Sequence, residues 1–585
     1  MRSFLKFFGA ALLALIVFTG VIFFIFFVIV SSISSSQKKT VSERSVLVLD
    51  LSRSFSDRKK DNTFSALSGD ADMTPVALFD LVRLINHAKS DSSIKGIYLK
   101  CNDNANGYAA SEEIRNALID FKQSKKFIIA YGDVISQKAY YVANAADKIY
   151  CNPKGAVDWK GFTSQLFFLK NTLNKLEIEP QIFYDGKFKS ATEPLREEKM
   201  TEANRLQTTV WLGDLYKRLL VTTSETRDID TATLHQYANM YAIRSASDAV
   251  KYKLIDAIKY DDEVKTELMQ KSGAPKVNEI NFITIGSYAE AINLKKYGSD
   301  RVAVIYAEGD IVYGKGEDGQ VGSDDFRALL ARVRNDKNIK AIVLRVNSPG
   351  GSALASEIIW RETQLAREAG KPLIVSMGDL AASGGYYISC GADSIFAQPN
   401  TLTGSIGVFG IIPNMQNFFK NKLGITFDQV KTADNADIGT ISRPLTASEK
   451  LIIQSEIDTI YADFKSRVAD GRKKDLTYVD SIAQGRVWTG NRAQTLGLVD
   501  KIGGLQDAIA CAAGMAKLKD YSLREYPEPK SFLDMLRNNY SKAIKTKAIK
   551  EELGNEAFLL YQQVKRIKDM TGTVQTRLPY DITVE

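Results

Sequence analysis

Hydrophobic and polar positions divide the chain into one long apolar segment near its start and a much longer region of alternating short patterns. Residues 7–30 contain no charged side chain. A bilayer is crossed by ~20 apolar helical residues, whereas the apolar part of a cleavable signal peptide is ~7 to 15 residues long. The segment therefore predicts an uncleaved transmembrane signal anchor within residues 1–30, followed by a Ser-rich tether over residues 31–44.

The charges that flank this segment bear on its orientation. Arg2 and Lys6 precede it, and a short basic N-terminus usually stays in the cytoplasm. This would place residues 31–585 on the far side of the membrane. Lys38 and Lys39 follow the segment and weaken that argument, so the orientation stays open.

Beyond the tether, short apolar runs alternate with amphipathic stretches. Residues 324–336 and 353–370 have helical spacing, and the apolar runs over 341–347 and 372–377 have the composition of buried strands. Strands that alternate with helices in this way indicate βαβ units around a largely parallel sheet. In such sheets, binding sites form in the loops beyond the carboxyl ends of the strands.

The chain contains an internal repeat. Residues 94–112 align without gaps on residues 339–357, and residues 131–153 align on residues 377–399 at almost the same spacing. A constant spacing of this kind indicates two copies of one fold. The anchor and tether are therefore expected to precede a first repeat over 45–270, a linker over 271–300, a second repeat over 301–515 and a helical C-terminal extension over 516–585.

The composition is that of a large globular protein. The 585 residues are 45% hydrophobic and 25% charged, and the chain is too long for a single core, since domains usually contain ~100 to 200 residues. The net charge of +8 is spread among acidic residues, which argues against a nucleic-acid-binding surface. The four cysteines form no CxxC pair and are expected to be buried without a metal or redox role.

The chain has only two histidines, His87 and His235. This scarcity leaves few ways to build a Ser-His-Asp triad or a histidine metal site. Neither histidine is flanked by a serine or carboxylate motif, so both are expected to be structural. Any hydrolytic chemistry is then expected to use another base.

Two glycine-rich turns follow neighbouring strands of the second repeat. Residues 348–352 read Ser-Pro-Gly-Gly-Ser, and residues 378–385 end in Ser-Gly-Gly before a helical pattern. Such turns expose backbone N–H groups, and a helix N-terminus adds a positive dipole, so together they can hold an oxyanion. Ser383 is therefore the candidate nucleophile, and Gly351 and Gly384 are the candidate oxyanion donors.

The first repeat lacks this turn chemistry. Asp-Asn-Ala-Asn-Gly stands at residues 103–107 in place of Ser-Pro-Gly-Gly-Ser, and Gln137, Lys138 and Ala139 replace Ser-Gly-Gly. The alternative explanation is that the small residues around Ser383 only allow a helix to pack on the sheet. The loss of both turns in one copy and their retention in the other favours the catalytic interpretation.

Four motifs follow one another in the second repeat. They are RVNSPGGS at residues 345–352, AASGGYYIS at 381–389, TLTGSIGVFG at 401–410 and GRVWTG at 485–490. In this order they resemble the signal peptide peptidase A family, Ser-Lys proteases of the Clp/crotonase superfamily (peptidase family S49), in its long form with two fused repeats. The resemblance covers nearly the whole region after the tether. It implies that Ser383 is the nucleophile and that Ser405 helps to position the base.

The same resemblance implies a lysine base in the first repeat. The family motif YKSAxEP matches residues 188–194, with Phe188 in place of the tyrosine, and puts the base at Lys189. The amine must be neutral to accept a proton, so its pKa has to fall from ~10.4 towards ~7, which burial in an apolar site can achieve. Lys187 is the competing lysine, and it would point to the opposite face of an extended segment. The alternative for Lys189 is an exposed lysine without a catalytic role.

The resemblance also implies the fold, the partners and the location. The fold is α/β, with a transmembrane helix followed by two tandem Clp/crotonase-like domains that assemble as a ring-like homotetramer. The implied substrates are signal peptides and other hydrophobic polypeptide segments, and no cofactor, metal or nucleic acid is expected. The implied location is the bacterial inner membrane, with the lipid bilayer around residues 7–30 and the catalytic region on the periplasmic side.

Two other function classes remain open. A crotonase-type acyl-CoA enzyme shares the fold and an oxyanion hole, but the N-terminal anchor and Ser383 argue against it. A catalytically inactive membrane scaffold is the second alternative, against which the presence of both Ser383 and Lys189 argues. The sequence therefore predicts a membrane-anchored serine endopeptidase with a dyad of Ser383 and Lys189.

Overall fold

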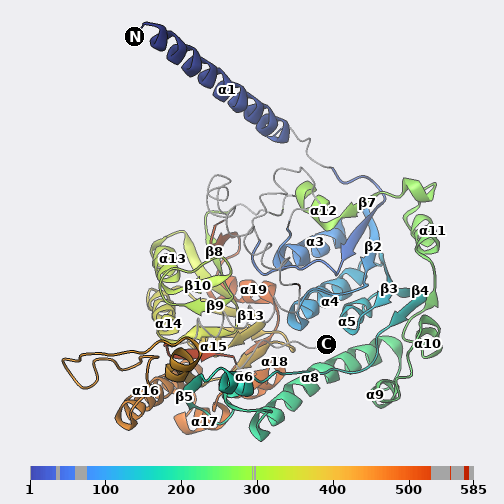
Figure 1. The fold of residues 1–585 in the computed structure, drawn as a ribbon. Coiled ribbons are helices and arrows are strands. Elements are labelled where there is room, and N and C mark those ends of the chain that lie inside the picture. Colours follow the sequence, from blue (N-terminus) through green and yellow to red (C-terminus); the bar gives the residue numbers. More distant parts are fainter. Residues whose placement is uncertain are drawn as a thin grey trace.

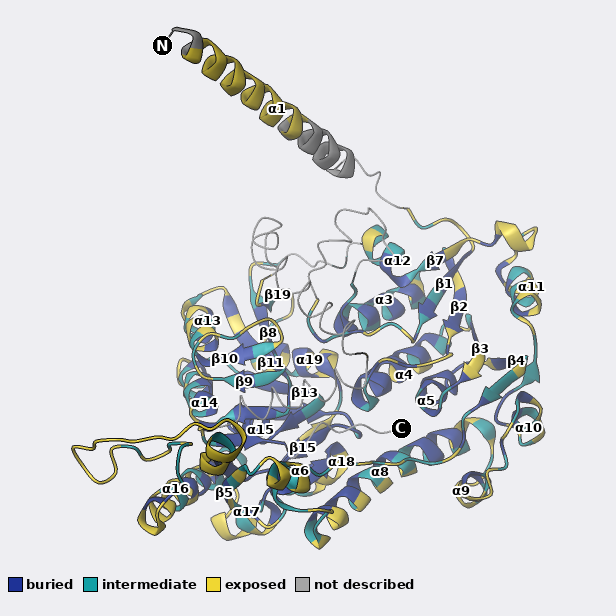
Figure 2. Cartoon of the chain, in the orientation of Figure 1, coloured by how far each residue is buried: buried dark blue, intermediate teal, exposed yellow. Residues whose placement is uncertain are grey.

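The computed structural model describes residues 2–34, 40–59, 75–292, 294, 298–528, 554 and 572–578 (Figure 1). The chain begins with helix α1 (Arg2–Ser34), which projects away from the two repeats (Figure 1). The described side chains of α1 are exposed (Figure 2). Among the described residues, no helix combines the length and the apolar character that membrane crossing requires. The membrane anchor expected within residues 1–30 therefore stays a prediction.

The first repeat is built on a six-stranded sheet in the order β6-β4-β3-β2-β1-β7. All neighbouring strands in it are parallel, because helices return the chain to the same end of the sheet. Buried apolar side chains such as Leu47, Ile97 and Ile128 form its core. The strands are β1 (Ser45–Asp50), β2 (Ile94–Lys100), β3 (Phe127–Ile135), β4 (Lys148–Val157), β6 (Ala257–Ile258) and β7 (Phe282–Thr284). The helices are α3 (Leu78–Ser90), α4 (Tyr108–Lys122), α5 (Gln137–Ala143), α6 (Lys170–Lys175), α7 (Glu193–Arg196), α8 (Glu202–Arg227), α9 (Thr231–Asn239), α10 (Ala246–Lys251), α11 (Asp261–Ser272) and α12 (Ile285–Ala291).

The second repeat contains an eight-stranded sheet whose main path has the order β17-β15-β13-β11-β8-β19, with β14 beside β13 and β18 beside β14. Only β17 is antiparallel to its neighbour. The strands are β8 (Arg301–Glu308), β11 (Ile339–Ser348), β13 (Leu373–Ala382), β14 (Ser394–Ala397), β15 (Leu402–Gly404), β17 (Val487–Thr489), β18 (Lys501–Ile502) and β19 (Ser522–Tyr526). The helices are α13 (Ser323–Asn335), α14 (Ala353–Glu368), α15 (Gly384–Tyr387), α16 (Ala447–Arg472), α17 (Leu476–Ile482), α18 (Gly490–Thr495) and α19 (Leu505–Met515).

The elements predicted from the clearest patterns are confirmed. Helices α13 and α14 cover the helical spacing over 324–336 and 353–370, and strands β11 and β13 cover the apolar runs over 341–347 and 372–377. The helix after Ser383, α15, contains only four residues and is shorter than its pattern predicts.

A third sheet joins segments from distant parts of the chain. Its order is β10-β9-β12-β20-β16-β5. Strand β5 comes from the first repeat and is antiparallel to β16 of the second, while β20 comes from near the C-terminus. The turn after β5 is thereby built into the second repeat. The strands of this sheet are β5 (Glu179–Asp185), β9 (Asp310–Val312), β10 (Gln320–Gly322), β12 (Gly350–Ser352), β16 (Val408–Asn414) and β20 (Gln575–Arg577).

Two expected boundaries need correction. The segment 271–300 is more than a linker, because β7 pairs with β1 and α12 follows it. The extension over 516–585 is not only helical, since β19 pairs with β8 and β20 joins the third sheet. Because β7 and β19 take equivalent places beside β1 and β8, each repeat extends one strand past its expected end. The rest of the C-terminal extension lies largely outside the described residues.

Buried polar contacts join the two repeats. Arg345 in β11 is 1% exposed and forms ion pairs with Asp57 at 2.7 Å and with Glu113 at 2.8 Å. Asp379 near the end of β13 accepts a hydrogen bond from the N–H of Ala109 at the start of α4, at 2.8 Å. Charges buried this deeply are tolerated only when each has its partner. These contacts hold the second repeat in a fixed position against the first. They therefore also fix the distance between side chains of the two repeats that lie near their interface.

Candidate active site

Ser383 lies in a strained turn between strand β13 and helix α15. Its backbone has φ +55° and ψ −113°, a conformation that L-residues rarely adopt. Its N–H donates to the carbonyl of Gly404 at 2.7 Å, and the residue is fully buried. The turn therefore holds the hydroxyl of the predicted nucleophile in one direction.

Lys189 reaches this hydroxyl from the other repeat. It follows β5 in a short turn and is 1% exposed. Its Nζ lies 2.8 Å from Oγ of Ser383 and 3.1 Å from Oγ of Ser405, and donates to the carbonyl oxygen of Ser405 at 3.1 Å. The structure thus brings together, within one chain, the three residues expected as base, nucleophile and positioning residue.

Burial controls the charge of Lys189. Desolvation lowers the pKa of its amine well below the ordinary value, and burial alone causes this shift. A neutral amine has the lone pair that a general base needs. Lys187, the competing lysine, is exposed and lies over the ring of Phe188. The geometry therefore favours Lys189 over Lys187 as a base.

The two glycine-rich turns meet beside Ser383. Gly350 has φ +99°, and a Cβ there would lie 2.7 Å from the nitrogen of Gly384. A Cβ on Gly351 would lie 2.0 Å from the carbonyl oxygen of Ile311. Side chains are therefore excluded at Gly350 and Gly351, and their bare backbone lies beside the turn of Ser383.

Strand β20 lies along these turns. It is antiparallel to both β12 and β16 and fills the space between them. Gly351 is paired with Thr576, and a Cβ on Gly384 would lie 3.0 Å from the carbonyl oxygen of Thr576. An extended peptide segment therefore passes directly beside the turn of the predicted nucleophile.

The residue after β20 enters an apolar pocket built by both repeats. Leu578 is 2% exposed, and its N–H donates to the carbonyl of Pro349 at 2.7 Å. Arg577 forms an ion pair with Asp310 at 2.7 Å. The buried side chains around Leu578 are Trp211, Leu215, Ala382, Leu402 and Val487. Because Ala382 directly precedes Ser383, this pocket adjoins the site.

Comparisons with known proteins agree with this arrangement. A profile of peptidase family S49 matches residues 120–274 and 365–519, once in each repeat. The chain belongs to peptidase family S49. It is 39% identical over 477 residues to Protease 4 of Salmonella typhi, which covers 80% of this chain and 77% of that relative.

Two further relatives cover a similar share. The S49 chain is 34% identical over 511 residues to Protease 4 of Haemophilus influenzae, covering 84% of this chain and 83% of the relative. It is 33% identical over 509 residues to the chloroplastic serine protease SPPA of Arabidopsis thaliana, covering 84% of this chain and 73% of the relative. These relatives and the two family matches identify the chain as a serine protease.

The S49 motif at residues 485–490 holds the lysine turn, a role that the sequence alone does not reveal. Gly485 has φ +72°, and a Cβ there would lie 2.7 Å from Cβ of Lys189. The N–H of Phe188 donates to the carbonyl of Gln484 at 2.7 Å. The only sequence signal is the glycine, because a left-handed position packed against another backbone cannot carry a side chain.

The first repeat of this peptidase has a structural amide where the second has Ser383. Gln137 aligns with Ser383, and its Nε2 donates to the carbonyl of Gly161 at 2.8 Å. Its Oε1 accepts hydrogen bonds from the N–H groups of Lys160 at 2.8 Å and Gly161 at 2.9 Å. The amide ties the turn to the following loop, so the fold persists in this repeat without a reactive hydroxyl.

The histidines and cysteines lie away from these contacts. His87 Nδ1 is 2.9 Å from the hydroxyl of Tyr288, and His235 is 3.1 Å from the amide of Asn239. The cysteines are free, three of them buried and Cys511 partly exposed. Within the part of the chain that the structure describes, no group of three His, Cys, Asp or Glu side chains is arranged to hold a metal.

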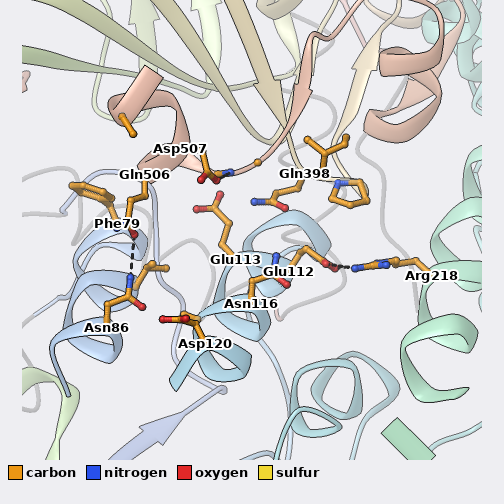
Figure 3. Close-up of a pocket in the computed structure, with 17 residues that line it drawn as sticks. Phe79, Asn86, Glu112, Glu113, Asn116, Asp120, Arg218, Gln398, Gln506 and Asp507 are labelled. Atoms are coloured by element: carbon orange, nitrogen blue, oxygen red, sulfur yellow. Dashed lines mark hydrogen bonds and ion pairs between the residues drawn. The ribbon is translucent and has the colours of Figure 1, made fainter. Parts of the chain in front are cut away.

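A separate cavity of about 640 Å³ lies between α3, α4 and α19 (Figure 3). Four acidic side chains line it; three of them have a cationic partner, and Asp507 accepts a hydrogen bond from the N–H of Gly504 at 2.8 Å. These pairs are Glu112 with Arg218, Glu113 with Arg345 and Asp120 with Lys89. The cavity therefore belongs to the interface between the repeats and is distinct from the site of Ser383.

Proposed function

We propose that the chain is a membrane-anchored serine endopeptidase with a catalytic dyad of Ser383 and Lys189. One observation carries the proposal: a buried lysine amine lies 2.8 Å from a buried serine hydroxyl, and the two side chains come from different repeats. Proton transfer needs a heavy-atom distance of ~2.6 to 3.2 Å. Burying a lysine is costly, so a lysine in this position is best explained by the need for a neutral amine.

In the proposed reaction, the neutral Nζ of Lys189 takes the proton from Ser383 as Oγ forms a bond to the carbonyl carbon of the peptide. The carbonyl oxygen becomes an oxyanion, which the N–H groups of Gly351 and Gly384 would stabilise. The ammonium of Lys189 then gives its proton to the leaving amine as the C–N bond breaks. A water molecule, deprotonated by the same amine, attacks the acyl-enzyme and releases Ser383.

Ser405 is proposed to orient the base. Its Oγ and its carbonyl oxygen each lie 3.1 Å from Nζ of Lys189. An amine held by two oxygens of one residue keeps its direction towards Ser383. This contact supports the role that the family resemblance implies.

Strand β20 supports a route for the substrate. It pairs with β12 and β16 as an added strand, and main-chain pairing of this kind accepts many sequences. The apolar pocket around Leu578 would suit a large aliphatic side chain, in agreement with signal peptides and other hydrophobic segments as substrates. A substrate on this route has to displace β20.

The anchor, the location and the assembly are further parts of the proposal. Residues 7–30 of α1 are uncharged, and their described side chains are exposed, which supports insertion in a bilayer. We place this anchor in the bacterial inner membrane with both repeats on the periplasmic side. A homotetrameric ring is proposed on the family resemblance alone.

A serine-reactive fluorophosphonate probe tests the dyad in the full chain. We expect the wild type to be labelled, Ser383→Ala to lose labelling, and Ser383→Ala and Lys189→Ala to lose peptide hydrolysis. Lys187→Ala is the matched control and should keep full activity. Loss of activity in Lys187→Ala with full activity in Lys189→Ala would overturn the assignment of the base.

The same experiment separates the alternatives. Folded wild type that neither reacts with the probe nor hydrolyses peptides would favour the inactive scaffold. Hydrolysis of acyl-CoA thioesters without hydrolysis of peptides would favour a crotonase-type enzyme.

A further inference from the structure

A buried amide links the lysine turn to the sheet that carries Ser383. Gln207 lies on α8 and is 1% exposed. Its Nε2 donates to the carbonyl of Phe188 at 3.1 Å and to Oγ of Ser190 at 2.9 Å. Phe188 and Ser190 are the two neighbours of Lys189 in the sequence, so the amide holds the chain on both sides of the base, through a backbone carbonyl on one side and a side-chain hydroxyl on the other.

The other end of the amide holds the second repeat. The Oε1 of Gln207 accepts a hydrogen bond from the N–H of Val487 at 3.2 Å. That N–H can only donate and the carbonyl of Phe188 can only accept, so these two contacts fix which way the amide faces. Neither a carboxylate nor a hydrocarbon of the same length can satisfy both partners.

Val487 connects this contact to the nucleophile. It belongs to β17 and is paired with Gly404 of β15. The carbonyl of Gly404 in turn accepts the hydrogen bond from the N–H of Ser383. The side chain of Gln207 and the pairing of β17 with β15 therefore connect the turn of Lys189 to the turn of Ser383.

Further buried hydrogen bonds hold Gln207 in place. Its Nε2 lies 3.2 Å from Oδ1 of Asn204, whose Nδ2 donates to Glu193 at 2.8 Å. Glu193 also accepts a hydrogen bond from the hydroxyl of Thr201, which caps the start of α8, at 2.6 Å. A connected network of buried hydrogen bonds restricts the rotamers of its members. Gln207 is therefore a rigid spacer.

We propose that Gln207 is a positioning residue for the base, holding the turn of Lys189 at a fixed distance from the strands that carry Ser383. This inference rests on the proposed dyad of Ser383 and Lys189. Gln207 is not a catalytic residue, because it contacts the residues beside Lys189 and not the reacting atoms. A displacement of about 1 Å between reacting groups can cost on the order of 100-fold in rate.

A looser lysine turn would also change the pH dependence. The elements beside Lys189 carry the charged groups of Glu179 and Asp185 on β5 and of Glu193 and Arg196 on α7. Arg486, which directly precedes β17, stacks on the ring of Phe188. The low pKa of Lys189 comes from burial and from none of these charges. Water that reaches the amine would stabilise the ammonium, so the acid limb of the pH–rate profile would move to higher pH.

Gln207→Met in the full chain tests the proposal, because methionine has a similar length and lacks the amide. We expect kcat for a peptide substrate to fall by about 10- to 100-fold, with KM changed by less than about twofold. The acid limb of kcat should move to higher pH. Thr209→Ala, at an exposed position on the same helix, is the matched control and should resemble the wild type.

A second variant covers the case in which Gln207→Met does not fold. Ser190→Ala removes one of the two acceptors beside Lys189 and should shift kcat and the acid limb in the same directions, by less. If the folded variants lose thermal stability while kcat and the acid limb stay unchanged, Gln207 is only structural and the proposal is overturned. A wild type without activity would instead disprove the dyad itself, so the two failures are distinguishable.

Discussion

Replacing Leu578 by alanine should weaken the binding of strand β20 between β12 and β16, beside Ser383. Leu578 is 2% exposed, and the preceding strand β20 pairs with β12 and β16 on its two sides. A substrate that uses the same strands must first displace this segment. On the proposed substrate route we therefore expect the segment to compete with the substrate, which would raise the apparent KM and leave kcat unchanged.

The size of the effect follows from the burial of one side chain. Leucine has three more carbon atoms than alanine, and burying them stabilises the bound segment by about 2 kcal/mol. Since each 1.4 kcal/mol is a factor of ten, the binding constant of the segment should fall about 30-fold. KM should fall by up to this factor, and by the whole of it if the segment lies between β12 and β16 nearly all the time.

Steady-state kinetics with a short fluorogenic peptide measure this change in the full chain. Leu476→Ala is the control, because Leu476 is a leucine on α17 that is 51% exposed. KM should fall in Leu578→Ala and stay constant in Leu476→Ala, with kcat constant in both. An unchanged KM in Leu578→Ala would refute the competition between β20 and the substrate.

Ser405→Ala should lower kcat by about 10- to 100-fold in steady-state kinetics, since it removes a hydroxyl 3.1 Å from Nζ of Lys189. A change in KM alone would contradict the orienting role of Ser405. Gly485→Ala should abolish peptide hydrolysis, because the new Cβ would lie 2.7 Å from Cβ of Lys189. An active, folded variant would show that the lysine turn can move to accommodate this Cβ. Arg345→Met should lower the free energy of unfolding by about 3 to 5 kcal/mol in denaturant titrations, because it leaves Asp57 and Glu113 buried without their cation. A loss below about 1 kcal/mol would show that these two ion pairs are dispensable for stability.

The parts of the fold that the sequence predicts are those with strong local patterns. The apolar runs of β11 and β13 and the amphipathic spacing of α13 and α14 each extend over many residues, so local periodicity identifies them. Ser383 could be predicted because its glycine-rich turn survives in one repeat and is lost in the other. Lys189 could be predicted only through the family motif, since nothing in its own sequence neighbourhood marks it as buried.

The third sheet could not be predicted, for a physical reason. Strand β20 is three residues long and polar, with the sequence Gln-Thr-Arg, and its pairing depends on strands more than 150 residues earlier in the chain. Strand β5 likewise leaves its own repeat to pair with β16. Main-chain hydrogen bonds of this kind leave almost no pattern in the side chains. The contacts of Gln207 and Gly485 with the lysine turn depend on the same long-range packing.

The pH dependence of phosphonylation of Ser383 is the sharpest test of the dyad of Ser383 and Lys189. The rate of labelling by a fluorophosphonate probe would be measured from acid to alkaline pH in the wild type and in Lys189→Ala. Only the neutral amine can accept the proton, so labelling should be lost as pH falls through the pKa of Lys189, at a pH well below the ordinary ~10.4 of lysine. We expect Lys189→Ala to lose both the labelling and this acid limb while its fold is unchanged. The same limb and the same rate in folded Lys189→Ala would contradict the role of Lys189 as the base.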